Sequence, residues 1–132
     1  MRVLNFGSLN IDYVYSLDHI VAPGETITSR GLEVFPGGKG LNQSVALARA
    51  GAEVCHAGMV GEDGGMLLDV CREAGVDVSR VRTVGTRTGN AIIQVSAKGQ
   101  NSIVLYPGAN RAITREYADG VLADFGPGDL LL

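Results

Sequence analysis

The stretch Pro36-Gly37-Gly38-Lys39-Gly40-Leu41-Asn42-Gln43-Ser44 decides how this chain folds and what it can bind. Its three glycines allow positive φ angles and a close approach of the backbone to another group, because no Cβ stands in the way. The residues after them predict a helix over 41–50, closed by Gly51. Free N–H groups at the start of that helix favour an oxygen-rich ligand, to which Lys39 adds a cation and Asn42 both a donor and an acceptor. The pattern predicts a polyol or phosphate site, with a plain tight turn into a helix as the alternative.

Two better-known glycine motifs are excluded. A P-loop requires Gly-x-x-x-x-Gly-Lys-Ser/Thr, but here Lys39 is followed by Gly40. The dinucleotide fingerprint Gly-x-Gly-x-x-Gly begins at Gly38 and fails at Gln43, where the third glycine should stand. A Walker nucleotide site is therefore not supported, and a dinucleotide oxidoreductase is a weak hypothesis.

Composition and charge describe an ordinary globular domain. The 132 residues are 45% hydrophobic and 19% charged, and the net charge of −3 gives no reason to expect a nucleic acid or an anionic membrane as partner. Cys55 and Cys71 lie in apolar runs and predict buried, reduced thiols. No apolar run approaches the roughly 18 residues of a membrane span, and no signal-peptide pattern is present. We therefore expect a cytoplasmic protein.

The apolar runs predict an α/β core with a parallel sheet and flanking helices. Short runs that end in glycine or turn residues are typical of buried parallel strands. We expect such strands at residues 2–7, 53–60, 81–84 and 129–132, and helices at residues 41–50, 66–74 and 114–123, the last capped by Thr114. His56 falls inside one of these strands and His19 in a polar loop, and we interpret both as structural.

Polar residues follow the first predicted strand. In open α/β sheets, ligands bind beyond the carboxyl ends of the strands, which makes Asn10 and Asp12 candidates for holding hydroxyl groups. The alternative is that both side chains only support a turn.

Alternating apolar and polar residues predict a second, half-exposed antiparallel sheet. One pair of strands is expected on either side of Pro23-Gly24, and a hairpin is expected around Gly99. The predicted strands are residues 13–17, 25–35, 90–97 and 102–106.

Six ordered motifs give the chain a resemblance to the ribokinase-like (PfkB family) sugar kinases, specifically to the N-terminal part of such a kinase. They are Gly7-Ser8-Leu9-Asn10-Ile11-Asp12, Pro23-Gly24-Glu25-Thr26, Gly37-Gly38-Lys39-Gly40-Leu41-Asn42-Gln43, Gly61-Glu62-Asp63, Gly75-Val76-Asp77 and Pro107-Gly108-Ala109-Asn110. Lys39 and the Gly-Ala-Asn segment resemble the ribokinases more than the fructokinases or nucleoside kinases of the family. The resemblance implies an α/β core with a β lid over residues 13–35 and 90–106. It also implies transfer of the γ-phosphoryl of ATP, with Mg²⁺, to a primary hydroxyl of ribose or a similar sugar.

The resemblance also assigns candidate sugar-binding residues. By matching positions, these would be Asn10, Asp12, Gly38, Lys39 and Asn42. A carboxylate such as Asp12 suits paired hydroxyls because it accepts two hydrogen bonds. As an apolar wall over the sugar ring we expect two further residues from the lid hairpin, Ala91 and Leu105.

The sequence departs from the family pattern in what it lacks. The Gly-Ala-Gly-Asp segment that holds the catalytic base does not occur, and neither do the nucleotide-binding region and the acidic residues associated with Mg²⁺. Asp63 and Asp129 fit the base poorly, because the first belongs to another motif and the second begins a strand. We therefore expect no catalytic residue in this chain, which resembles the front part of a longer kinase and would be inactive alone. A non-catalytic sugar-binding or oligomerisation module is the alternative.

A lid with open edges also predicts self-association. Exposed apolar edge strands recruit partners, and the family resemblance implies lids paired across a two-fold axis. We expect a homodimer through the lid, with residues such as Ile92 or Ile103 in the contact.

Overall fold

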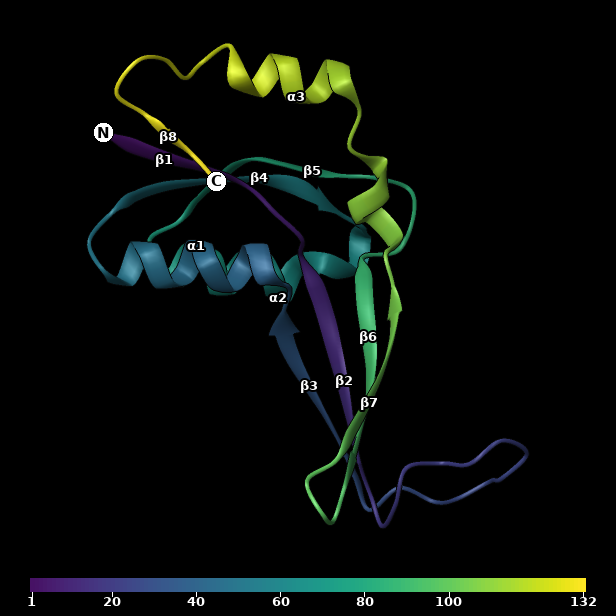
Figure 1. Ribbon diagram of the computed structural model, residues 1–132. Coiled ribbons are helices and arrows are strands. Elements are labelled where there is room, and N and C mark those ends of the chain that lie inside the picture. The colour runs from purple at the N-terminus through teal and green to yellow at the C-terminus, as the bar shows by residue number, and fades with distance from the viewer.

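A computed structural model describes all 132 residues and shows two sheets set at an angle to each other (Figure 1). The core sheet has the strand order β5-β4-β1-β8, and every neighbouring pair in it is parallel. Its strands are β1 Arg2–Phe6, β4 Glu53–Val60, β5 Asp77–Thr83 and β8 Leu130–Leu131. The predicted α/β class with a parallel sheet and flanking helices is confirmed.

Helices cover both faces of the core sheet. Helices α1 (Lys39–Arg49) and α2 (Gly65–Glu73) lie below it in Figure 1, and α3 (Arg115–Leu122) lies above. The lower core joins apolar residues of α1 and α2 to β1 and β4, because these helices carry hydrophobic residues at helical spacing on one side. Its buried members include Val3, Leu41, Val45, Val54, Leu67 and Cys71.

The upper core is smaller and is built around α3. The Thr114 Oγ1 atom accepts a hydrogen bond from the Tyr117 N–H at 3.2 Å and caps the helix, as predicted. The hydroxyl of Tyr117 donates to the Arg80 carbonyl at 2.6 Å, which ties the helix to β5. Cys55 is buried on this side, so both cysteines are buried free thiols as expected.

The second sheet is the lid, which projects from the core in Figure 1. Its strands are β2 Asn10–Leu17, β3 Gly31–Gly37, β6 Gly89–Ser96 and β7 Asn101–Tyr106, in the order β3-β2-β6-β7. The two outer pairings are antiparallel, but the central pairing of β2 with β6 is parallel. The sequence did not predict this pairing, which arises because β2 and β6 both run outward from the core.

The connection between β2 and β3 is longer than expected. We predicted a strand from residue 25, but β3 begins at Gly31, and no strand occurs between residues 18 and 30. The reason is local, because the Glu25 carboxylate folds back onto its own turn. It accepts from the Ala22 N–H at 2.8 Å and lies 2.7 Å from His19 Nε2.

No helix of the protein is both long and apolar enough to cross a membrane.

Candidate functional site

The glycine turn between β3 and α1 is packed too tightly for side chains. A Cβ on Gly37 would collide with the Asp12 carboxylate, and one on Gly38 would collide with the Ser8 carbonyl oxygen. Gly38 also has a φ of 99°, which side chains disfavour. No side chain caps α1 at Gly38, and within the first turn the Leu41 N–H donates instead to the Ser8 carbonyl at 3.1 Å. The turn therefore sets the start of α1 directly beside Asp12.

Asp12 lies on β2, the first lid strand, which begins at Asn10 rather than at the predicted residue 13. Its carboxylate is half-buried against Gly37 and receives no hydrogen bond from any protein group. Burial without a compensating donor raises its pKa above the ordinary value of 3.8. Such a carboxylate is free to accept hydrogen bonds from a ligand that carries hydroxyl groups.

Asn10 is fixed by a residue a hundred positions away. Its Oδ1 atom accepts a hydrogen bond of 2.8 Å from Asn110 Nδ2, and Asn110 Oδ1 in turn accepts from the Leu9 N–H at 3.0 Å. The sequence marked Asn110 as part of a family motif but gave it no role. The structure shows that it orients Asn10, which lies two residues before Asp12 and therefore on the same face of β2.

Lys39 and Asn42 lie on the first turn of α1, and both are exposed. The backbone N–H of Asn42 donates to the Gly38 carbonyl at 3.0 Å, so the helix is regular from its first turn. Neither side chain makes a hydrogen bond or an ion pair within the protein. Both are free to turn toward a ligand placed between this turn and the lid.

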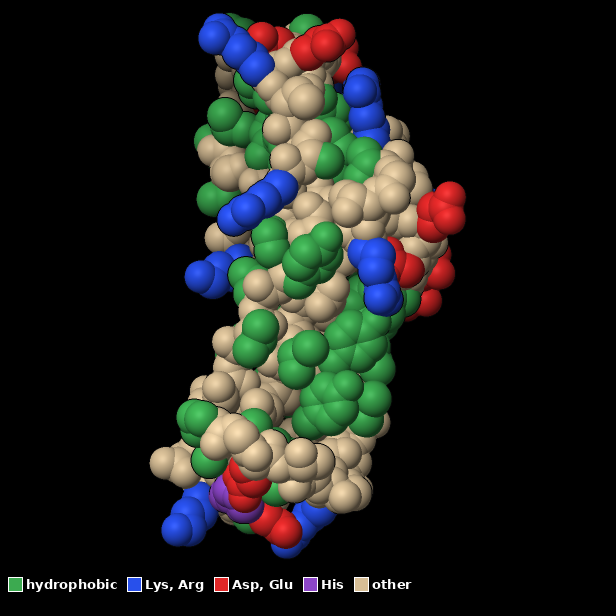
Figure 2. Space-filling view, turned by 90° about the vertical axis from the view of Figure 1, so that its right-hand side faces the viewer, with side chains coloured by type: hydrophobic (Ala, Val, Ile, Leu, Met, Phe, Trp, Pro, Cys, Tyr) green, Lys and Arg blue, Asp and Glu red, His purple; other side chains and the backbone are tan.

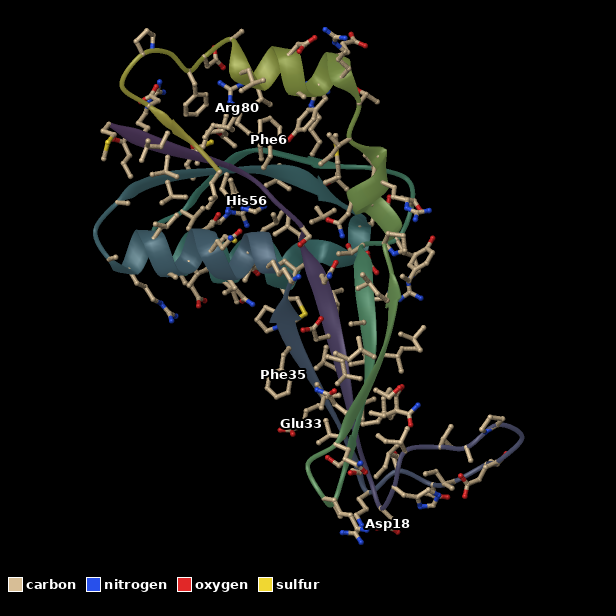
Figure 3. All side chains as sticks on the ribbon, in the orientation of Figure 1. Phe6, Asp18, Glu33, Phe35, His56 and Arg80 are labelled. Atoms are coloured by element: carbon tan, nitrogen blue, oxygen red, sulfur yellow. The ribbon has the colours of Figure 1, made fainter.

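Ala91 and Leu105 join Asp12 in one row across the lid. Asp12 pairs with Ala91, and Ala91 pairs with Leu105, so all three point to one face of the sheet. Ala91 is buried, whereas Leu105 is exposed on the edge strand. Phe35 completes the row on the other side of Asp12, and Figure 3 shows its ring projecting from β3. The sequence missed Phe35, although its position two residues before Gly37 could have placed it on this face.

Asp63 and Asp129, which fit the catalytic base poorly by their sequence positions, both have partners within the protein. Asp63 accepts from the Thr88 N–H at 2.9 Å and from the Thr88 hydroxyl at 2.7 Å, and these bonds lower its pKa. Asp129 pairs with Arg2 at 2.7 Å, and that pair lowers its pKa to about 2. Both carboxylates are thus held by other groups of the protein, and their lowered pKa values make them weaker bases than an ordinary aspartate.

The structure contains no group of three or more His, Cys, Asp or Glu side chains that could hold a metal ion. Mg²⁺ in kinases is usually held by one or two carboxylates together with the phosphates of the nucleotide, so the Mg²⁺ that the family resemblance implies stays a prediction.

The chain is similar in sequence and in structure to known carbohydrate kinases. A model of the pfkB family carbohydrate kinases matches residues 2–132. The ribokinase of Haemophilus influenzae is 38% identical over 129 residues, which are 96% of this chain and 42% of that protein. Ribokinase from Cryptococcus neoformans var. grubii, solved with ADP, is 49% identical with a TM-score of 0.77, covering 82% of this chain and 35% of that one. Arabidopsis thaliana ribokinase, solved with ribose and ATP, is 32% identical with a TM-score of 0.72, covering 83% and 36%.

The α/β core with its β lid is the fold of these solved ribokinases. The chain belongs to the PfkB family of carbohydrate kinases. The relatives named above are ribokinases, and the chain spans about two fifths of their length. The family and fold class predicted from the six ordered motifs are confirmed.

Proposed function

We propose that this chain forms the sugar-binding part and the lid of an ATP-dependent kinase that phosphorylates the primary hydroxyl of ribose or a similar sugar. The observation that carries the proposal is the placement of the unpaired Asp12 carboxylate beside the glycine turn that starts α1. The solved Arabidopsis ribokinase with ribose and ATP supports the choice of sugar and phosphoryl donor.

The predicted side chains each have a chemical role in this proposal. Asp12 accepts hydrogen bonds from two neighbouring hydroxyls of the sugar, and Asn10 adds an amide held in place by Asn110. Lys39 and Asn42 supply donors from the helix side. The apolar lid row forms a wall over the sugar ring and excludes water; it consists of Phe35, Ala91 and Leu105. Phosphoryl transfer depends on such positioning more than on covalent chemistry.

The 132-residue chain is proposed to be inactive when tested alone. It contains no Gly-Ala-Gly-Asp segment, and the carboxylates outside the sugar site that we weighed as bases are paired. A coupled assay with ribose and Mg·ATP should therefore show no turnover. Turnover that Asp12→Ala abolishes would contradict this expectation.

The sugar site itself can be tested by calorimetry with ribose. Asp12→Ala should weaken binding by about 2 kcal/mol, the order of a lost charge-assisted hydrogen bond. A matched control is Asp69→Ala, which removes an exposed carboxylate on α2 that pairs only with Arg72 at 3.0 Å. Equal ribose affinity in the wild type and the Asp12 variant would refute the assignment.

We further propose that the lid is the contact surface of a homodimer. The exposed apolar side chains of the lid are the observation that favours this oligomerisation role. Hydrophobic side chains gather over the lid in Figure 2, below the charged surface of the core. Ile92 and Ile103, which we predicted for this contact, point to opposite faces of the lid, because Ile92 pairs with Val104 and Ile103 with Ile93. The Ile92 face carries more exposed apolar side chains: Leu32, Val34, Ile92, Val104 and Tyr106. It also has a hollow of about 260 Å³ beside Ile92, and we assign the dimer contact to it.

A further inference from the structure

A closed hydrogen-bond network lies beneath the start of α1, where no ligand could touch it. Its three side chains, Asn5, Ser44 and His56, are at most 1% exposed. Asn5 Nδ2 donates to the Ser44 hydroxyl and to the Gly40 carbonyl, both at 3.0 Å. The Ser44 hydroxyl lies 2.7 Å from His56 Nδ1, and His56 Nε2 lies 3.1 Å from the Gly7 carbonyl oxygen. Figure 3 shows His56 between the core sheet and α1.

The partners of the network fix its protons. A carbonyl only accepts, so His56 Nε2 must carry the hydrogen that reaches Gly7. His56 Nδ1 is then an acceptor for the Ser44 hydroxyl, whose oxygen accepts from Asn5. In this arrangement the imidazole is neutral and carries its hydrogen on Nε2. Burial acts in the same direction and lowers the pKa of His56, against the smaller opposite effect of the Gly7 carbonyl.

The network joins the two segments that carry the sugar site. Gly7 opens the segment that leads through Ser8 to Asn10 and Asp12, whereas Gly40 belongs to the start of α1. The backbones touch at the same point, because a Cβ on either glycine would collide with the other. The Leu41 N–H adds a hydrogen bond of 3.1 Å to the Ser8 carbonyl.

Apolar side chains could fill the same space, but they would make no directional bond that fixes the Gly7 carbonyl relative to α1. An imidazole is a rigid ring with one bond at each end, so it holds the Gly7 carbonyl at a set distance from α1. On the helix side, Asn5 binds Gly40 and Ser44 independently of His56. On the Gly7 side, the backbone N–H donates to the Ala57 carbonyl at 3.1 Å, and His56 is the one side chain that hydrogen-bonds to the Gly7 carbonyl.

We propose that His56 is a positioning residue that, through its bond to the Gly7 carbonyl, sets the Asn10–Asp12 segment against the start of α1. The expected effect on sugar affinity rests on the proposed sugar site. The hydrogen bonds of His56, in contrast, are present without a ligand. The proposal assigns His56 a role in ligand affinity that goes beyond filling the core.

Two substitutions separate the two bonds of the imidazole. His56→Gln places an amide nitrogen where Nε2 lies and keeps a donor for Gly7, while His56→Asn places an amide oxygen near Nδ1 and keeps only the Ser44 bond. The ribose affinity of His56→Gln should stay near that of the wild type, and that of His56→Asn should fall about tenfold through misplacement of the site. The matched control is Tyr117→Phe, which removes buried hydrogen bonds on the far face of the core sheet.

Amide hydrogen exchange tests the role of His56 in the absence of a sugar. The Leu41 amide, which spans the two segments, should exchange about tenfold faster in His56→Asn but not in His56→Gln or Tyr117→Phe. The Ala118 amide in α3 serves as the internal reference. The proposal is overturned if Leu41 exchanges alike in both His56 variants, or if Tyr117→Phe matches His56→Asn in either measurement. If the wild type binds no ribose, the sugar-site proposal fails, whereas the exchange result still decides the role of His56.

Discussion

Asp12 loses part of its hydration on the lid without gaining a hydrogen bond from the protein, and burial raises its pKa above 3.8. A raised pKa means that the folded protein favours the neutral acid more than the unfolded chain does. The charge at neutral pH therefore costs stability, which a bound polyol would offset by donating to the carboxylate. This is the balance expected of a binding residue rather than of a structural one.

The pH dependence of ribose affinity should follow this shift. As the pH falls through the raised pKa, the protonated carboxyl loses acceptor capacity, so affinity should begin to fall at a higher pH than an ordinary aspartate would give. Calorimetry between about pH 7 and about pH 4 measures the effect. Asp12→Asn is the control, because its weaker affinity should not change over this range and its stability at pH 7 should be no lower than that of the wild type. An unchanged wild-type affinity down to about pH 4 would contradict the role of the carboxylate.

Gly38 and Gly51 allow a matched test of the glycine turn, since both have a positive φ, of 99° and 92°. A Cβ on Gly51 meets nothing within 4 Å, whereas one on Gly38 meets the Ser8 carbonyl and the Asn10 N–H. Gly51→Ala should therefore cost about 1 kcal/mol of backbone strain, and Gly38→Ala clearly more. Urea unfolding gives both values. Equal costs would show that the turn tolerates a side chain.

At the scale of elements, the starts of α1 and α3 differ in a way that matches their roles. Helix α3 is capped by Thr114, which satisfies a free N–H group inside the protein. Helix α1 has Gly38 at the same position and no side-chain cap. The start of α3 is thus capped by a side chain of its own segment, whereas the start of α1 is held by a distant backbone group, the Ser8 carbonyl that accepts from the Leu41 N–H.

The cap of α3 should be measurable in stability alone. Thr114→Ala should lower the free energy of unfolding by about 1 kcal/mol, because the Tyr117 N–H loses its acceptor. Thr114→Ser keeps a hydroxyl and should be nearly neutral. Thermal or urea unfolding of the two variants checks this. A loss of equal size in Thr114→Ser would point to the lost methyl group instead of the cap.

At the scale of the whole molecule, the lid exposes apolar side chains on both faces, and the Ile92 face exposes more of them. An exposed face of this kind is stabilised by association. If the Ile92 face is the dimer contact, Ile92→Glu should give a monomer in sedimentation at micromolar concentration. Ile103→Glu, on the opposite face, is the matched control and should leave the dimer intact. A wild-type monomer, or a dimer that survives Ile92→Glu, would refute the contact.

The sequence by itself determined the elements whose signals are local. The glycine turn predicted the start of α1, and Thr114 predicted the start of α3. The apolar run at residues 53–60 predicted β4 with its observed bounds. These features depend on residues within one or two turns of each other, so propensity and periodicity are sufficient to find them. The ordered motifs also placed the chain in its family.

Only the tertiary structure decided how those elements meet. The parallel pairing of β2 with β6, the position of Phe35 beside Asp12 and the hydrogen bond from Asn110 to Asn10 all join residues that are far apart in the chain. The same holds for His56, which in the sequence is one polar residue in an apolar strand. Its partners, Ser44 on α1 and Gly7 just after β1, reach it only after the core has packed. Local patterns cannot specify such contacts, because register and packing fix which distant side chains share a face.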